Sequence, residues 1–488
     1  MPHSAAFPSV PPQPPPRSVR SLTRHALDRA TDAVLSTGNA IELLIDARAN
    51  FDAWLAAIRA SRNSIFLENY IVEDDDVGRE FRDALCARAS AGVRVAVVYD
   101  WLGCLGNTGA KFWKPLHDAG GEARVFNPPR LDSPFGWVGR DHRKLLVVDG
   151  DIGFVSGICL SQKWLGNTER GLAPWRDTGV AIRGPACADI ACAFADSWAQ
   201  LGTPLDVDIA VPAPVGESNL RVIATTPQRA GVYRTDLFVA AMARETLWLT
   251  DAYFVGIAPY VQALCAAARD GVDVRLLVPG SSDLRLVAQM SRAGYRPLLE
   301  AGVKVFEWNG TMLHAKTAVA DAYWARVGSS NLNVASWLSN CEIDIAVEDA
   351  AFAQCMAAQY EIDLRNATEI ILERKRVTRA GPKLPRQRRG TGSSSRAAAS
   401  TLRLVNTVGA ALGNRRVLGT AETGLLPPTA LALVATAIVA FLWPAVVAWP
   451  LAALAAWSGV TMLLRYLNLR RKSKVTRGPS GKARDGLE

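Results

Sequence analysis

Two copies of one short pattern carry most of the chemistry in this chain. Each copy reads His-x-Lys-x4-Asp, once in "DHRKLLVVDG" and once in "LHAKTAVAD". The members of the two copies are His142, Lys144, Asp149, His314, Lys316 and Asp321. On an extended strand, residues two apart point to the same face, so each His and Lys would project together. An imidazole beside an ammonium suits a phosphodiester, because one group attacks or donates a proton while the other binds anionic oxygens.

A single copy would be weak evidence for catalysis. A lone His near a strand is commonly structural, and a Lys flanked by Val and Leu commonly extends its ammonium to the surface. The chain has only five histidines, however, and two of them occupy identical places. Each copy also continues alike, because six residues separate the Asp from a turn of small residues, Ser156-Gly157-Ile158-Cys159 or Gly328-Ser329-Ser330-Asn331. The repetition favours a duplicated catalytic unit.

The paired motif resembles that of the phospholipase D superfamily, in which His-x-Lys-x4-Asp-x6-Gly-Ser-x-Asn occurs in two halves of one chain. The resemblance spans residues 36–375 and includes "SIFLENYIVEDDDVGREF", "GVRVAVVYD", "WRDTGVAIRGP" and "GSSNLNVASWLSNCEIDIAVED". Within the superfamily these blocks are most similar to bacterial cardiolipin synthases of the type without an amino-terminal membrane hairpin. The superfamily also holds hydrolases, phosphatidylserine synthases and nucleases.

The first copy departs from the superfamily pattern in its turn. Ser156 stands at the first Gly position, and Cys159 stands where the superfamily has Asn. An amide offers donors and an acceptor to a phosphate, whereas a thiol is a weak hydrogen-bonding group. The second copy carries the full pattern, with Gly328, Ser329 and Asn331 in place.

The resemblance implies a two-step phosphatidyl transfer. His142 would attack phosphorus, and His314 would act as acid and then as base. The choice of His142 as nucleophile follows superfamily precedent alone, so the reverse assignment stays open. Lys144, Lys316, Ser329 and Asn331 would bind the phosphate oxygens. The remaining motif members, Asp149 and Asp321, lie past the strand ends, so a structural role in the turn or in a neighbouring strand is expected for both.

Each imidazole also needs a carboxylate that holds its tautomer. Asp177, in "WRDTG", follows the first motif, and Glu342, in "NCEID", matches the acidic residue that follows the second motif in the superfamily. We therefore expect the pairs Asp177–His142 and Glu342–His314. The alternative is that both are ordinary exposed carboxylates.

Aromatic residues precede the first motif in "FNPPRLDSPFGWVGR". Phe126, Phe135 and Trp137 could cover the site against lipid and exclude water, which transfer to an alcohol requires. They could equally be core residues.

The elements around the motifs predict an α/β fold. In the first half, 41–46, 64–71 and 93–100 are typical of strands, with helices at 49–61 and 78–92 between them. The second half repeats this order, with strands at 245–254, 272–279 and 303–308 and helices at 258–271 and 291–302. Such alternation predicts a mixed, mostly parallel sheet flanked by helices in each half. Two pseudo-symmetric halves that face each other would bring both motifs into one cleft.

Composition limits the classes of function. The chain has 488 residues and a net charge of +9, which suits an anionic partner such as an acidic membrane or a nucleic acid. Much of the positive charge lies outside the motif halves, in 373–390 and 470–484. The eight cysteines show no zinc-type spacing, so small buried thiols in a reducing compartment are expected. No metal or other cofactor is required.

The pattern divides the chain into six segments. We expect a disordered Pro-rich tail, a first half, a second half, a basic linker, a transmembrane hairpin and a basic cytoplasmic tail, at 1–17, 18–210, 211–378, 379–424, 425–464 and 465–488. No signal peptide is expected, because no apolar run follows the amino-terminal residues.

The carboxy-terminal hairpin is predicted from forty residues, 425–464, that carry no charge. One spanning helix needs about 20 residues. Both flanks are basic, which places both ends in the cytoplasm and requires an even number of spans. A re-entrant pair and a buried soluble helix pair are the alternatives. The expected location is the bacterial inner membrane, with the catalytic part in the cytoplasm.

These features favour a membrane phospholipid as substrate. In a cardiolipin synthase, two phosphatidylglycerol molecules would give cardiolipin and glycerol through a phosphatidyl-histidine intermediate. A phospholipase D hydrolase or a phosphatidylserine synthase is the closest alternative, because it shares the site and differs in acceptor. A nuclease is less favoured, since the motif flanks are apolar or acidic, and no nucleic-acid partner is expected. An inactive membrane scaffold is opposed by two intact triads. The oligomeric state stays open.

Overall fold

The computed structural model describes residues 19–129 and 139–373 apart from 168, 170 and 208, together with 376–379 and scattered positions between 431 and 460. Phe135, Trp137 and most of the predicted hairpin at 425–464 lie outside the described residues. Among the residues that are described, no helix combines the length and the apolar character needed to cross a membrane.

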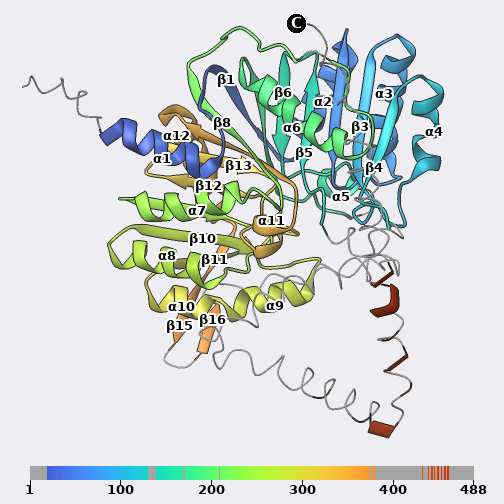
Figure 1. Ribbon diagram of the computed structural model, residues 1–488. Coiled ribbons are helices and arrows are strands. Elements are labelled where there is room, and N and C mark those ends of the chain that lie inside the picture. The colour runs from blue at the N-terminus through green and yellow to red at the C-terminus, as the bar shows by residue number, and fades with distance from the viewer. Residues whose placement is uncertain are drawn as a thin grey trace, which may run out of the picture.

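Within the described residues, sixteen strands form one sheet, whose course can be followed in Figure 1. The strands of the first half are β1 (Ser36–Ile45), β2 (Ser64–Asn69), β3 (Arg94–Asp100), β4 (Glu122–Phe126), β5 (Lys144–Val148), β6 (Ile152–Ser156) and β7 (Thr178–Arg183). Those of the second half are β8 (Ser218–Thr225), β9 (Thr246–Thr250), β10 (Asp273–Pro279), β11 (Lys304–Trp308), β12 (Thr317–Ala320), β13 (Trp324–Gly328) and β14 (Glu342–Glu348), followed by β15 (Ala367–Glu373) and β16 (Arg376–Arg379).

The helices alternate with these strands as the sequence predicts. They are α1 (Val19–Thr31), α2 (Asp46–Ala60), α3 (Asp76–Ser90), α4 (Ala110–Asp118), α5 (Gln162–Leu165), α6 (Ala186–Gln200), α7 (Gly231–Met242), α8 (Ala258–Arg269), α9 (Arg285–Ala293), α10 (Tyr295–Glu300), α11 (Val334–Leu338) and α12 (Ala350–Leu364). The single helix expected at 291–302 is in fact two helices, α9 and α10, which meet at Gly294. Glycine weakens a helix interior, so this break is a local property of the sequence.

The sheet shows the duplication directly. From the centre outward, the first half runs β1-β7-β6-β5-β2-β3-β4, and the second runs β8-β14-β13-β12-β9-β10-β11. The halves join where β1 pairs antiparallel with β8. Corresponding elements therefore sit at corresponding distances from the junction, with the two motif strands β5 and β12 in equivalent places.

The expectation of a mostly parallel sheet is wrong. Among the described strands, parallel pairing is confined to β2–β3–β4 and β9–β10–β11, and the other neighbours are antiparallel. The reason is local. Each motif strand turns back through a tight hairpin, β5–β6 or β12–β13, and a short connection can join only antiparallel strands.

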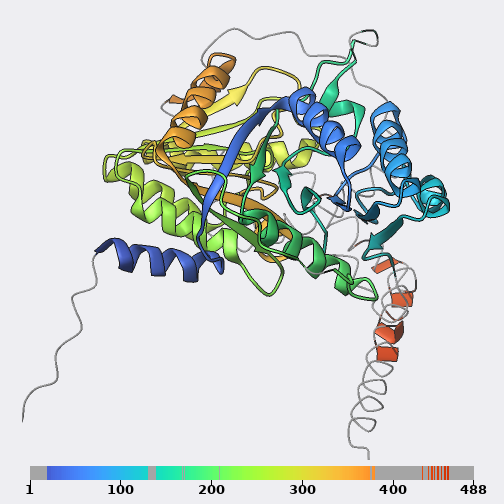
Figure 2. The same cartoon turned by 90° about the horizontal axis from the view of Figure 1, so that it is seen from above.

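Helices cover both faces of each half (Figure 2). In the first half, Ile65 and Leu67 of β2 pack in a cluster with α2, α3 and α4, whereas Phe66 between them packs on the other face, where its ring stacks on Phe194 of α6. In the second half, Leu247 and Leu249 of β9 pack with α7 and α8, while the intervening residue stacks on α12. Strands buried on both faces are rigid supports for the segments that leave their ends.

Candidate active site

Each motif lies at the entrance to its strand. Lys144 is the first residue of β5, and Lys316 directly precedes β12. His142 and His314 lie two residues earlier, and both are almost fully buried. Each lysine Nζ donates to the carbonyl oxygen of the His in its own motif, at 2.6 Å for Lys144. The expectation that His and Lys project together from extended chain is consistent with this geometry.

Backbone bridges connect each motif to the opposite half. The amide of His142 donates to the carbonyl of Cys341 at 2.8 Å, and the amide of His314 donates to the carbonyl of Arg176 at 2.7 Å. Cys341 directly precedes Glu342, and Arg176 directly precedes Asp177. Each bridge therefore delivers a carboxylate of one half to the histidine of the other.

The predicted carboxylate pairs are consequently wrong, although both carboxylates contact a histidine. Glu342 Oε2 lies 2.8 Å from Nδ1 of His142, and Asp177 Oδ2 lies 2.8 Å from Nδ1 of His314. The expected pairs followed order along the chain, whereas the backbone bridges cross the pseudo-two-fold axis. Where Nδ1 donates to its acidic partner, Nε2 of the imidazole keeps its lone pair available for chemistry. Nζ of Lys316 also lies 2.9 Å from Nδ1 of His314.

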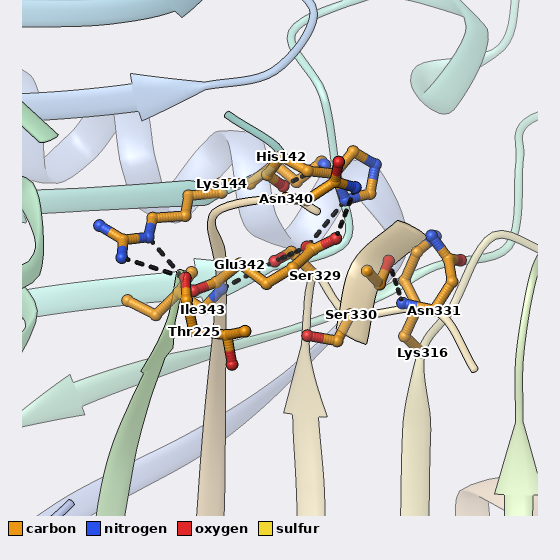
Figure 3. A network of polar contacts seen from close by, with 12 residues as sticks. His142, Lys144, Thr225, Lys316, Ser329, Ser330, Asn331, Asn340, Glu342 and Ile343 are labelled. Carbon is orange, nitrogen blue, oxygen red and sulfur yellow. Dashed lines mark hydrogen bonds and ion pairs between the residues drawn. The ribbon is translucent and has the colours of Figure 1, made fainter. Parts of the chain in front are cut away.

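Glu342 is buried and held by neutral donors (Figure 3). Ser329 Oγ donates to it at 2.6 Å, and Asn340 Nδ2 donates at 3.2 Å. Burial raises the pKa of Glu342 to about 7, and this effect outweighs the opposing charge of Lys144. The hydroxyl of Ser329 donates to Glu342, and the phosphate contact expected for Ser329 stays a prediction.

Asp177 has the opposite character. It accepts hydrogen bonds from the indole Nε1 of Trp164 at 2.9 Å and from the amide of Thr178 at 2.8 Å. Burial opposes its ionisation, but His314 and Lys316 outweigh burial and bring the pKa of Asp177 down to about 2. The carboxylate beside His314 is therefore ionised, whereas the one beside His142 holds a proton up to neutral pH.

The two motifs share one electrostatic environment. Burial, and then the charge of Lys316, lower the pKa of His314 to about 3, and Lys144 acts on His314 in the same direction. Burial also lowers the pKa of Lys316 to about 8, with Lys144 contributing. Two buried ammonium groups that repel each other form a site for an anion, because a bound anion would relieve both.

The aspartates of the motifs clamp turns and do not contact the imidazoles. The carboxylate of Asp149 accepts from the backbone amides of 62–64 at 2.7–2.8 Å, and that of Asp321 accepts from the amides of 244–246 at 2.8–3.0 Å. Their φ angles of 54° and 50° are in the left-handed region, which Asp tolerates better than most residues. The structural role expected for both is confirmed.

Comparison with known proteins agrees with this geometry. A family model described as a cardiolipin synthase, phospholipase D-like domain matches residues 239–364. A cardiolipin synthase of Alkalihalophilus pseudofirmus is 31% identical over 344 residues, which cover 69% of this chain and 68% of that protein. Cardiolipin synthase A of Pseudomonas aeruginosa is 35% identical over 358 residues, which cover 72% and 73%. The chain belongs to the cardiolipin synthase family.

The fold also resembles a solved structure of a phosphatidylserine synthase from Haemophilus influenzae. The TM-score is 0.58 at 15% sequence identity, and the match covers 71% of this chain and 91% of that one. At this identity the likeness concerns the fold alone.

Within the family motif, the two small-residue turns are built differently. A Cβ atom on Gly157 would lie 2.3 Å from Asp177, so no side chain fits at the position that Ser329 occupies in the second half. A Cβ on Gly328 would lie 2.4 Å from Asp344, which explains the glycine there. Cys159 is buried and lies close enough to Lys144 for their charges to interact, and the second half has Asn331 at the equivalent position of its turn.

Aromatic rings enclose the imidazoles, most closely around His314. The rings of Trp164, Trp175 and Tyr253 have centroids 5.1, 5.7 and 5.7 Å from that of His314, and Tyr70 lies 4.7 Å from His142. Sequence reasoning missed these residues. Trp175 could have been found from the sequence, because it directly precedes "RDTG" in the block that contains Asp177.

Phe126, considered earlier as a cover for the site, is instead buried at the end of β4 in the cluster that includes α6.

Proposed function

We propose that this protein is a phosphatidyltransferase that makes cardiolipin and glycerol from two molecules of phosphatidylglycerol. The observation that carries the proposal is the pair of crossed His–carboxylate contacts, each with a buried lysine beside it. Two imidazoles are the groups that a double displacement at phosphorus requires, one as nucleophile and one as acid and base. Membership of the cardiolipin synthase family supports the choice of lipid.

In the first step, Nε2 of His142 forms a bond to the phosphorus of one phosphatidylglycerol while the bond from phosphorus to the glycerol oxygen breaks. His314 gives its Nε2 proton to the departing glycerol oxygen. In the second step, His314 removes the proton from a hydroxyl of the second phosphatidylglycerol. That oxygen attacks phosphorus, and the bond from phosphorus to His142 breaks. The second phosphatidylglycerol thereby gains the phosphatidyl group.

The two carboxylates support this assignment of roles. The acid must carry a positive charge, and Asp177, with its pKa near 2, is ionised beside His314. The anionic substrate offsets the charges of Lys144 and Lys316, which both lower the pKa of His314, so substrate binding raises that pKa. The nucleophile must be neutral, and the partner of His142 is Glu342, whose pKa is raised to about 7.

Lys144 and Lys316 bind the non-bridging oxygens in this scheme, because each is a buried cation that contacts the histidine of its own motif. Asn331 adds its amide beside Lys316, and its buried Oδ1 has no hydrogen-bond partner in the described part of the chain. Preorganised donors of this kind stabilise the charge of the five-coordinate transition state.

The test uses the purified full chain with phosphatidylglycerol vesicles, and mass spectrometry identifies the products. Wild type is expected to form cardiolipin and glycerol in equal amounts, and His142→Ala and His314→Ala are expected to form neither. Phosphatidic acid as the only product would identify water as the acceptor and overturn the synthase proposal. Product formation by both variants would overturn the roles of the histidines.

We also propose that residues 425–464 anchor the enzyme in the bacterial inner membrane as a helical hairpin, with the catalytic halves in the cytoplasm. Forty uncharged residues between basic flanks support this, because one span needs about 20 residues. Sodium carbonate extraction of membranes is expected to retain the full chain and to release a chain that lacks 425–464. Release of the full chain would overturn the anchor.

A further inference from the structure

The first half lacks the amide that its motif turn should supply. Cys159 takes the place of Asn331, and its thiol is buried beside Lys144. A thiol is a poor hydrogen-bonding group, so it cannot replace an amide at a phosphate oxygen. The turn of the second half therefore carries a buried amide, that of Asn331, and the turn of the first half carries a thiol at the equivalent position.

A different residue brings an amide to the same place. Asn69 is the last residue of β2, and it lies directly opposite Lys144 in the antiparallel register of β2 and β5. Side chains of directly opposed residues lie on the same face of a sheet. Nδ2 of Asn69 donates to the carbonyl of Ile158, the residue before Cys159, at 3.4 Å.

The amide of Asn69 is only partly used. Its side chain is fully buried, and Oδ1 has no hydrogen-bond partner among the residues that the structure describes. Nδ2 makes this one hydrogen bond within the described part of the chain, which leaves its second N–H available. A buried carbonyl oxygen without a donor is costly, so Oδ1 of Asn69 calls for a donor, which the ammonium of Lys144 on the neighbouring strand can supply.

In the second half, the strand-end position carries an acid and the turn position carries the amide. Asp251 directly follows β9 and lies close enough to Lys316 for their charges to interact, as Asn69 lies opposite Lys144. Its carboxylate is satisfied by the backbone amides of Leu332 at 2.9 Å and Tyr253 at 3.1 Å. The amide with an unpaired Oδ1 is here Asn331. A buried amide with an unpaired Oδ1 is thus carried by the strand end opposite the motif lysine in the first half and by the motif turn in the second.

We propose that Asn69 binds the substrate phosphate beside Lys144 and takes the role that Asn331 has beside Lys316. The free N–H of Asn69 donates to a non-bridging oxygen, and Oδ1 accepts from the ammonium of Lys144. Asn69 then supplies the amide that the first motif turn, with Cys at position 159, does not. This inference rests on the proposed function in that the anion bound is a phosphodiester.

The proposal is tested by removing the amide at position 69 and introducing one at position 159. Asn69→Ala is expected to lower kcat about 10- to 100-fold and to weaken binding of inorganic phosphate about 10-fold, as loss of one hydrogen bond to a charged group predicts. Phosphate binding is read as the rise in melting temperature with phosphate concentration. Cys159→Asn is expected to restore most of both losses in the double variant Asn69→Ala/Cys159→Asn.

Two further variants separate binding from folding. Asn69→Asp keeps the size of the side chain but puts a negative charge at the anion, so it is expected to weaken phosphate binding even where Asn69→Ala folds poorly. Asn39 is the matched control, because it is a buried Asn on β1 whose Oδ1 accepts from the amide of Ala186 at 2.9 Å. Asn39→Ala is expected to lose stability, to keep its affinity for phosphate, and to gain nothing from Cys159→Asn.

The outcomes distinguish this inference from the proposed function. Wild-type phosphate affinity in both Asn69 variants, or no recovery when Cys159→Asn is added to Asn69→Ala, would overturn the role of Asn69 even if cardiolipin is formed. The expected phosphate results together with no cardiolipin would uphold the role of Asn69 and overturn the proposed lipid reaction.

Discussion

The imidazole of His142 is held by Glu342, whose Oε2 lies 2.8 Å from Nδ1 although the two residues belong to different halves of the molecule. Asp177 and His314 form the reciprocal contact. Each catalytic imidazole therefore depends on a carboxylate that the opposite half supplies. Neither half has a complete histidine site of its own, and the duplicated unit can work only as a pair.

The crossed pairs predict which variant perturbs which histidine. Glu342→Gln and Asp177→Asn are each expected to lower kcat roughly 10²- to 10⁴-fold, because the tautomer of the paired imidazole is no longer held. In ¹⁵N-histidine spectra, Glu342→Gln should shift the Nδ1 signal of His142 and leave that of His314 in place. Asp177→Asn should do the reverse. The opposite pattern of shifts would contradict the crossed pairs.

The raised pKa of Glu342 predicts a stability effect with a definite sign. A carboxyl with a folded pKa of about 7 and an ordinary value of 4.5 holds its proton more tightly in the folded state. Its contribution to the free energy of unfolding is therefore present below pH 4.5 and falls as the pH rises to 7, by about 3 kcal/mol in total. Glu342→Gln mimics the protonated form and lacks this loss.

Urea unfolding at several pH values measures this effect. Glu342→Gln is expected to gain stability relative to wild type between pH 5 and 8, although it loses activity. Glu80→Gln, at an exposed residue of α3, controls for the loss of one negative charge. A difference between wild type and Glu342→Gln that does not change with pH would count against the raised pKa.

Trp164 is expected to act on catalysis through Asp177. Trp164→Phe keeps a ring beside His314 but removes the N–H that donates to Asp177 at 2.9 Å. The loss of this donor raises the pKa of Asp177, since the hydrogen bond favours the ionised form. We expect kcat to fall about 10-fold and the acidic limb of its pH profile to move to higher pH.

Trp175→Phe is the matched control, because Trp175 also lies against His314, whereas the indole that donates to Asp177 in the described structure is that of Trp164. Its pH profile is expected to keep the wild-type acidic limb. Equal profiles for the two variants would show that Trp164 contributes only its ring.

Asp149 predicts a stability effect without a catalytic one. Asp149→Ala leaves three backbone amides without their acceptor and puts Ala at a φ of 54°, so the free energy of unfolding should fall by about 1–3 kcal/mol. Asp149→Asn should lose less, because an amide oxygen still accepts and Asn tolerates this φ. Activity per folded molecule should stay within about twofold of wild type. A large loss of kcat in folded Asp149→Asn would assign Asp149 a part in the reaction.

Much of the site could be predicted from the spacing of residues along the chain alone. The repeated His-x-Lys-x4-Asp pattern identified both histidines and both lysines, and strand–helix alternation identified most elements of the two halves. The turn role of Asp149 also followed from sequence, because a residue just past a strand end is in position to bind backbone amides. These are local relationships, and short-range spacing determines them.

What spacing could not decide was contact between the halves. His142 takes its carboxylate from Glu342 and not from Asp177 because backbone bridges at Cys341 and Arg176 cross the pseudo-two-fold axis. The tertiary structure likewise placed Trp164 on Asp177 and Asn69 opposite Lys144, and it made the sheet mainly antiparallel. The sequence by itself determined the chemical groups and their duplication. Only the folded chain decided their partners, because partners distant in sequence are chosen by strand register and burial, which no local pattern encodes.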